Sequence, residues 1–157
     1  MQNPYVACVS PNLQITGAGP GVNNPSIINI PVAGSVTDVN VYINCLHTWV
    51  GDLDFTLSHA GVSRVIVDQP GVPATTYGCS GDNIDATLDD AAATAVEGVC
   101  SVNAPAIGSP PAYRPNNLLN GFNGTQMMGN WNLVIDDGFS AGDNGTLLQW
   151  CVEIAWQ

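Results

Sequence analysis

Apolar and polar residues alternate in several stretches of this chain, and a period of two is typical of β-strands that bury one face. Alternating stretches at 39–43 and 53–57 lie on either side of a corner at Gly51 and Asp52. Two such strands joined by a short turn predict a β-hairpin, with acidic residues at the corner where a strand ends. The rest of the chain repeats this design, so the sequence predicts a β-sandwich with an acidic rim.

The last two alternating stretches are the clearest. One runs from 131 to 136, and in the other every second residue from Leu148 to Trp156 is apolar. The connection between them contains Asn144 and Gly145, a strong turn signal that predicts a second hairpin. Together the patterns predict strands at 5–9, 27–30, 36–46, 53–59, 63–68, 131–136 and 146–156.

The remaining segments show no comparable pattern. Residues 1–24 are expected to form an extended lead-in that includes the strand at 5–9, and the Pro-rich stretch 69–120 is expected to be mostly loop. The Ala-rich residues 88–97 favour a helical turn, because Asp89 and Asp90 suit a helix N-terminus. With no heptad and no internal repeat, we expect a single all-β domain over 1–157.

The charge balance limits the partners of the chain. There is no Lys, Arg64 and Arg114 are the only cations, and 13 acidic residues give a formal net charge of −11. Nucleic acid and anionic membranes need positive charge, so neither is expected as a partner, and no run of about 18 apolar residues could span a membrane. Two interpretations of the acidity stay open: it maintains solubility, or some carboxylates converge on Ca²⁺.

Five cysteines in a Gly- and Pro-rich chain indicate an oxidising compartment. None is spaced as C-x-x-C, so a zinc or thioredoxin-type site is not expected. Cys79 and Cys100 flank the most polar loop and are the predicted disulfide. The partners of Cys8, Cys45 and Cys151 stay open; Cys45 is in phase with a buried strand face, which would leave the other two to pair. The first residues lack the features of a signal peptide, so a secreted form is expected to be cut from a longer precursor.

Three clusters of acidic residues could supply oxygen ligands to Ca²⁺, which takes about six to eight of them. None follows the EF-hand pattern, because Thr87 stands where that loop requires Gly. Each cluster also suits a solvated turn, since Asp and Asn favour turns on their own. The clusters are Asp52 with Asp54; Asp82, Asn83 and Asp85 with Asp89 and Asp90; and Asp136 and Asp137 with Asp143 and Asn144.

Ser140 lies in a G-x-S-x-G motif at 138–142, the pattern of the nucleophile elbow in serine hydrolases. That motif needs a helix after the serine, whereas a turn and a strand are predicted here. Its chain order also places the histidine last, whereas His47 and His59 precede Ser140. Catalysis at Ser140 is therefore the weakest hypothesis, and both histidines are expected to be structural hydrogen-bonding residues.

A series of short motifs across 25–157 resembles the P domain (P/Homo B domain) of proprotein convertases, in the bacterial branch that is attached to secreted subtilisin-like and other proteases. The motifs follow the order of that family. They are TDVNV at 37–41, HTWVGDL at 47–53, GDNI at 81–84, LDDAA at 88–92, YRP at 113–115, FNG at 122–124, GNWNLVIDD at 129–137 and GDNGTL at 142–147.

This resemblance implies a jelly-roll-type β-sandwich of antiparallel strands with long loops and no catalytic residues. It also implies a place beside a protease catalytic domain, in folding, stabilisation or substrate presentation, and often bound Ca²⁺. Carried onto this chain, the implied metal ligands are Asp52, Asp82, Asp89, Asp90, Asp136 and Asp143.

The leading hypothesis is therefore a non-catalytic, Ca²⁺-stabilised P domain of a secreted bacterial serine protease, whose catalytic domain is the expected partner. The alternative is a module that binds polysaccharide or another cell-surface ligand, because flat aromatic faces such as that of Trp49 stack on sugars. Trp131, Trp150 and Trp156 are in phase with apolar neighbours and are expected in the core.

Overall fold

The computed structural model describes residues 4–16, 25–139 and 142–157. These residues form ten strands in two sheets and three short 3₁₀ helices, and no helix among them is long and apolar enough to cross a membrane. The prediction of an all-β sandwich is confirmed. The six-stranded sheet holds β1 (Tyr5–Val9), β2 (Leu13–Ile15), β4 (Val36–His47), β7 (Ile84–Leu88), β8 (Ile107–Gly108) and β10 (Gly145–Trp156). The four-stranded sheet holds β3 (Ser26–Ile30), β5 (Leu53–His59), β6 (Val62–Asp68) and β9 (Gly129–Asp137), and the 3₁₀ helices are η1 (Val50–Asp52), η2 (Val96–Gly98) and η3 (Leu119–Phe122).

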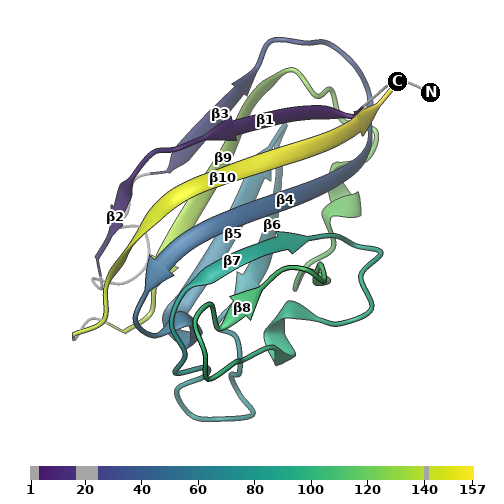
Figure 1. Cartoon of the computed structure of the whole chain (residues 1–157). Coiled ribbons are helices and arrows are strands. Elements are labelled where there is room, and N and C mark those ends of the chain that lie inside the picture. Colours follow the sequence, from purple (N-terminus) through teal and green to yellow (C-terminus); the bar gives the residue numbers. More distant parts are fainter. Residues whose placement is uncertain (1–3, 17–24, 140–141) are drawn as a thin grey trace.

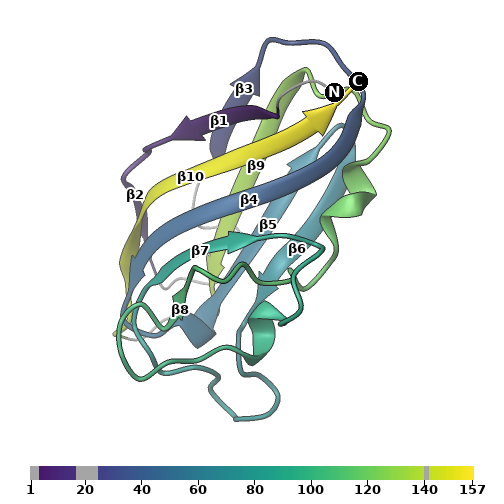
Figure 2. The same cartoon turned by 45° about the vertical axis from the view of Figure 1, so that its right-hand side comes forward.

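The two sheets face each other as the layers of a sandwich (Figures 1 and 2). The six-stranded sheet has the order β1-β10-β4-β7-β8, with β2 also pairing with β10, and the other sheet has the order β3-β9-β5-β6. These pairs are antiparallel apart from β7 with β8. Every strand predicted from the sequence is present, with bounds that differ by at most two residues.

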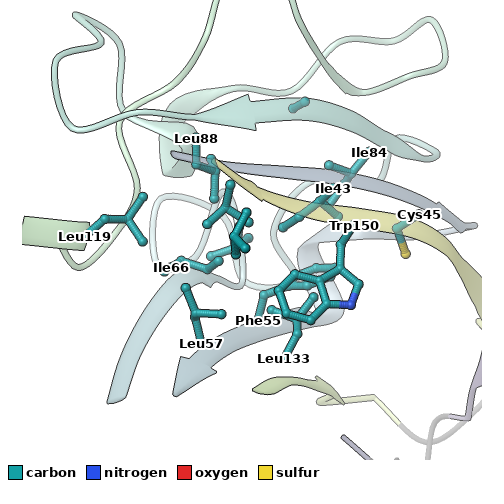
Figure 3. Packing of buried hydrophobic residues seen from close by; sticks show 14 of the residues in the cluster. Ile43, Cys45, Phe55, Leu57, Ile66, Ile84, Leu88, Leu119, Leu133 and Trp150 are labelled. Atoms are coloured by element: carbon teal, nitrogen blue, oxygen red, sulfur yellow. The ribbon is translucent and has the colours of Figure 1, made fainter. Parts of the chain in front are cut away.

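The core fills the space between the sheets with the inward-facing residues of both. Along β9 the period of two turns Trp131, Leu133 and Ile135 inward, where they are fully buried as predicted. Phe55 of β5 and Trp150 of β10 are also fully buried, and Figure 3 shows Phe55, Leu133 and Trp150 packed together. Because burial of one such side chain stabilises the fold by about 1.5–3 kcal/mol, this layer holds the sheets together.

Both predicted hairpins are wrong. β4 belongs to the six-stranded sheet and β5 to the four-stranded sheet, so the corner at Gly51 and Asp52 carries the chain from one sheet to the other. The link after β9 does the same on its way to β10, and so does the link after β6 on its way to β7. An alternating pattern says which face of a strand is buried, but strands in opposite sheets around one core show the same pattern as a hairpin.

The stretch 69–120 contains more regular structure than the sequence predicted. β7 pairs with β4, and the alternation of Ile84, Ala86 and Leu88 was the available signal for it. The helical turn predicted at 88–97 is wrong, because Leu88 ends β7 and only Val96–Gly98 forms a 3₁₀ turn. The short strands β2 and β8 were also missed, since two or three residues are too few to show a period.

β10 shifts its register at a bulge between Leu147 and Gln149. The bulge buries Leu147 in place of the predicted Leu148, whereas Trp150 and Val152 keep their predicted inward positions. A bulge inserts one extra residue into a strand, so a regular count of alternate positions fails on one side of it.

The structure forms the predicted Cys79–Cys100 disulfide, which joins the link after β6 to the segment after η2. Cys8 of β1 is bonded to Cys151, its direct partner across the ladder with β10, and Cys45 is a buried free thiol. The cysteine pairing that the sequence left open is thereby resolved.

Candidate functional site

Three links between the sheets pass the same end of the sandwich, which we call the crossover end. They follow β4, β6 and β9, and this end lies in the lower part of Figures 1 and 2. Segments that are far apart in the sequence therefore meet there. The strand register shows the convergence: His47 pairs with Gly145, Leu53 with Asp137, Asp54 with Asp68, and Cys45 with Ile84.

His47, the last residue of β4, and Asp137, the last residue of β9, form a buried pair that joins the two sheets. His47 Nε2 lies 2.9 Å from Asp137 Oδ2, and neither side chain is exposed. The amide of Trp49 donates to His47 Nδ1 at 3.1 Å, so the proton of the neutral ring is on Nε2 and is donated to Asp137. Asp137 Oδ1 accepts a second hydrogen bond from the amide of Phe139. This pair holds two of the three links in place.

Asp52 ends η1 close to this pair, but its carboxylate is not satisfied. The residue is only 6% exposed, and its Oδ2 has no hydrogen-bond partner. Burial, and then repulsion from Asp137 and Asp143, raise the pKa of Asp52 to about 6, although His47 acts in the opposite direction. A buried carboxylate oxygen without a hydrogen-bond partner costs free energy, so this site favours a bound donor or cation.

A pocket of about 150 Å³ opens beside Asp52. Two of its walls are aromatic and unusually exposed: Tyr77 is 60% and Phe139 46% exposed. Their rings meet edge to face, with centroids 5.9 Å apart. The residues that line the pocket, which we call the aromatic-acid pocket, are Trp49, Asp52, Tyr77, Phe139 and Asp143.

Close backbone packing positions this pocket. The amide of Gly51 donates to the Cys79 carbonyl at 2.8 Å, and a Cβ on Gly51 would collide with the backbone amide of Cys79, so this position of η1 requires glycine. The disulfide to Cys100 anchors the same segment. Trp49 Nε1 donates to the carbonyl of Tyr77 at 2.7 Å, which fixes the indole against the link after β6.

A second group of acids lies on the outer face of the four-stranded sheet. Asp54 stands opposite both Asp68 and Asp136 in the strand register. Burial, a hydrogen bond with Asp68 and repulsion from both neighbours raise the pKa of Asp54 to about 7. Glu97 Oε1 accepts a hydrogen bond from the Asp68 amide at 2.8 Å, and burial raises the pKa of Glu97 to about 7. One oxygen each of Asp54 and Glu97 is buried without a hydrogen-bond partner.

The six residues that the resemblance implies as metal ligands do not converge. Asp52 and Asp143 line the aromatic-acid pocket, Asp136 belongs to the outer acid group, and Asp82 is exposed ahead of β7. In the described part of the chain, no group of three or more His, Cys, Asp or Glu residues is arranged to hold a metal ion. The implied ligands therefore do not make up a ready-formed calcium site.

The remaining two implied ligands, Asp89 and Asp90, serve the backbone. Asp90 accepts hydrogen bonds from the amides of Leu119 and Asn120 at 2.7 and 2.8 Å, at the start of η3. Asp89 Oδ1 accepts from the amide of Ala91 at 2.7 Å. The carboxylate of Asp90 therefore ties the segment after β7 to η3, whereas that of Asp89 closes a local turn.

Sequence reasoning missed several residues of the crossover end. It placed Asp136 in the site rather than Asp137, although the alternation along β9 indicates that residue 137 faces inward with Ile135. Tyr77 and Phe139 lie in links between strands, where no periodicity marks which side chains meet.

Both histidines have the structural role that was predicted for them. His47 holds Asp137, and the ring of His59 stacks on Trp131 with centroids 3.9 Å apart. The ring nitrogens of His59 lie 2.9 and 2.7 Å from the carbonyl oxygens of Asn130 and Gln126. Ser140, the candidate nucleophile, lies outside the described residues.

The sequence matches no family model and no curated protein. The fold is similar to that of a serine protease of Aeromonas sobria, with a TM-score of 0.57 and 15% identity, over 98% of this chain and 26% of that chain. A structure of the Aeromonas sobria serine protease in complex with its chaperone matches with a TM-score of 0.56 and 16% identity, over 96% of this chain and 26% of that chain. This chain thus spans about a quarter of the length of those chains.

At these identities the similarity shows a shared fold. The chain is a β-sandwich domain with two disulfides, and disulfides are typical of proteins that work outside the cytosol. Its distinguishing local feature is the crossover end, where a satisfied buried His47–Asp137 pair stands next to an unsatisfied Asp52.

Proposed function

We propose that this chain is a non-catalytic accessory domain of a secreted bacterial serine protease, of the P domain (P/Homo B) type. The observation that carries this proposal is the fold similarity, which covers 98% of this chain but only 26% of a serine protease of Aeromonas sobria. A domain of this size would make up about a quarter of such a protease. The rest of the protease would include a catalytic domain, and this domain would lie beside it.

The motifs that resemble the P domain support the proposal, because several of them build the crossover end. The motif at 47–53 contains His47 and η1, the motif at 129–137 is β9, and the motif at 142–147 leads into β10. Part of the resemblance thus falls where the links between the two sheets meet, which is the part of a sandwich that sets its chain path.

The engagement of both histidines supports a non-catalytic role. A general base must reach the proton of its substrate, but the side chain of His47 is unexposed and both of its ring nitrogens are used by Trp49 and Asp137. Both ring nitrogens of His59 face backbone carbonyls. The domain would therefore act on its partner mechanically, by assisting folding, adding stability or presenting substrate.

Calcium stabilisation is a separate part of the proposal. It stands on the resemblance and on the excess of carboxylates in a chain of net charge −11, not on an assembled ligand set. An ion that binds only the folded state at a hundredfold excess over its Kd would stabilise that state by about 2.7 kcal/mol.

For polysaccharide binding, the alternative function, the chain exposes few aromatic side chains on which a sugar could stack. Trp131 and Trp150 are fully buried, and Trp156 packs against the core. Tyr77 and Phe139 at the crossover end are the aromatic side chains that are clearly exposed in the described part of the chain, and their chemistry is taken up below.

The accessory role is tested on the full-length protein that contains residues 25–157. We expect its gene to encode a serine protease domain, and we expect deletion of 25–157 to reduce the yield of active secreted protease and to speed its thermal inactivation. The variant Glu153→Gln, at an exposed position of β10 in the same full-length protein, serves as the control for expression. A full-length protein without a protease domain, or a deletion that leaves yield and inactivation rate unchanged, would contradict the proposal.

A further inference from the structure

We infer that the aromatic-acid pocket binds the cationic side chain, Arg or Lys, of a partner polypeptide. The inference does not depend on the accessory role proposed above, since it concerns the chemistry of one pocket. It rests on an unpaired buried carboxylate, on exposed aromatic faces around it, and on the lack of a cation from this chain to fill the site.

The carboxylate oxygen without a partner is Oδ2 of Asp52. The residue is 94% buried, it lines the pocket, and its Oδ2 lacks a hydrogen-bond partner in the folded chain. Asp137 nearby has both oxygens occupied by donors, so it cannot relieve Asp52 and instead repels it. Asp143 adds another carboxylate to the pocket wall. A guanidinium or ammonium group inserted here would pair with Asp52 and be held by charge-assisted hydrogen bonds.

The aromatic walls favour the same kind of ligand. The face of an aromatic ring carries partial negative charge and attracts Lys and Arg groups that lie over it. Trp49, Tyr77 and Phe139 stand around the opening, and the exposed Tyr77 and Phe139 rings meet edge to face. Their apolar surfaces would also cover the methylene stem of a Lys or Arg side chain, which needs apolar contact along its length.

The chain does not fill this pocket from within. It has no Lys, and neither of its two arginines lines the pocket. Arg114 Nη1 donates to the carbonyls of Ala92 and Ala93, and the guanidinium of Arg64 lies against Gly121. The cation must therefore come from another molecule, to which a chain of net charge −11 presents a favourable field.

The size of the pocket selects a single side chain. Pockets that enclose whole small molecules measure about 300–1,000 Å³, whereas this one measures about 150 Å³. A bare Ca²⁺ ion would require about six to eight oxygen ligands, and this pocket offers two carboxylates among three aromatic rings. An anionic ligand would be repelled by Asp52 and Asp143.

The test is a ¹H–¹⁵N NMR titration of the whole chain with the probes N-acetyl-arginine amide and N-acetyl-lysine amide. N-acetyl-citrulline amide, which has nearly the shape of the arginine probe but no charge, is the matched control. We expect saturable shifts of the Trp49 indole N–H and the Phe139 amide with both basic probes and not with citrulline. The absence of saturable shifts with the basic probes, or equal shifts with citrulline, would overturn the inference.

Two variants test whether binding depends on the charge in the pocket rather than on the stability of the fold. Asp52→Asn should weaken binding of the arginine probe about tenfold or more, because it removes the buried charge that the cation meets. This variant should fold, since it relieves an unsatisfied carboxylate. Glu153→Gln, at an exposed acid of β10 outside the pocket, should leave the affinity unchanged. Equal affinity of the Asp52→Asn variant and the unmodified chain would contradict the assignment.

Two further titrations identify other occupants. If CaCl₂ displaces the arginine probe and moves the Trp49 indole with saturation, the pocket is a metal site and the inference is wrong. If a soluble cello-oligosaccharide moves the same resonances and the basic probes do not, the pocket is a sugar site. We expect neither titration to shift these two resonances.

Discussion

His47 Nε2 lies 2.9 Å from Asp137 Oδ2, although the two residues end strands of different sheets and are 90 positions apart in the sequence. Neither side chain is exposed. The pair therefore links the two sheets at the point where the chain passes from one sheet to the other. It fixes the distance between the last residue of β4 and the last residue of β9.

Replacing Asp137 by Asn should destabilise the domain. The carboxylate accepts hydrogen bonds from two donors, His47 Nε2–H and the amide of Phe139, and an amide side chain can accept only on its one oxygen. One buried donor is then left unsatisfied, which costs about 1–3 kcal/mol of the free energy of unfolding. Urea unfolding measures this loss, with the exposed Glu153→Gln variant as control. Equal midpoints for the two variants would show that the pair is not a structural link.

Ser26→Ala should also destabilise, because it breaks a hydrogen bond between the sheets. The indole Nε1 of Trp150 in β10 donates to Ser26 Oγ in β3 at 2.8 Å, and both residues are buried. Removal of the hydroxyl leaves the indole N–H without a partner in the core, at a cost of about 1–3 kcal/mol. Chemical denaturation should show this loss for Ser26→Ala and none for the exposed Ser80→Ala. A similar stability for both variants would contradict the prediction.

The two disulfides should contribute unequally. Cys8–Cys151 closes a loop with a sequence separation of 143, and Cys79–Cys100 one of 21. Loop-closure entropy predicts that removal costs about 5 kcal/mol for the first and about 3 kcal/mol for the second. Paired Cys→Ala variants at each bond, compared by urea unfolding, check the order. A larger loss from the shorter loop would mean that local packing near Cys79 outweighs chain entropy.

The stability of the domain should fall as the pH rises from about 4.5 to about 7. Burial raises the pKa of Glu97 from 4.5 to about 7, so in this window the folded state holds a proton that the unfolded state has released. The folded state therefore loses stability with rising pH, and the loss is complete above the folded pKa. Allowing for screening at this partly exposed position, the effect is on the order of 1 kcal/mol.

Glu97→Gln isolates this contribution. Gln keeps the acceptor for the Asp68 amide but has no charge to bury, so the variant should gain melting temperature over the unmodified chain at pH 8 and little at pH 4.5. Glu153→Gln, an exposed glutamate on β10, is the matched control. The same pH dependence of the melting temperature in the Glu97→Gln variant would rule out Glu97 as its source.

Calcium should raise the melting temperature, and a chelator should lower it again, if the proposed calcium stabilisation holds. The reason is that an ion bound only to the folded state shifts the unfolding equilibrium, by about 2.7 kcal/mol at a hundredfold excess over Kd. Differential scanning calorimetry in CaCl₂, in MgCl₂ and in EDTA measures this shift. A melting temperature that is the same in all three would contradict the calcium proposal and leave the fold assignment untouched.

Local pattern predicted the strands of this protein well. Trp131, Leu133 and Ile135 at alternate positions, with Asn132 and Asp136 among their neighbours, identify β9 and its buried face, because side chains of a strand point alternately to its two sides. The same reasoning found β4, β5 and β10 and predicted the buried thiol of Cys45. The bulge at Leu147 broke the pattern, since it depends on the pairing with β4 rather than on β10 itself.

The arrangement of the candidate site could not be predicted from local sequence pattern. The sequence showed that Asp52 and Asp143 are acidic and lie in links, but it could not show that they line one pocket with Tyr77. Whether a carboxylate is solvated, bonded to an amide like Asp90, or buried without a partner like Asp52 depends on groups far away in the chain.

What the sequence determined by itself is therefore the class of fold, the faces of the long strands and the acidic character of the chain, because these follow from the order of side chains along one backbone. Only the tertiary structure decided which strands share a sheet, that β4 and β5 are joined by a crossover rather than a hairpin, and that Asp137 rather than Asp136 pairs with His47. The physical reason is that burial and hydrogen bonding are relations between segments, and a strand's own pattern specifies its buried side but not the neighbour that buries it.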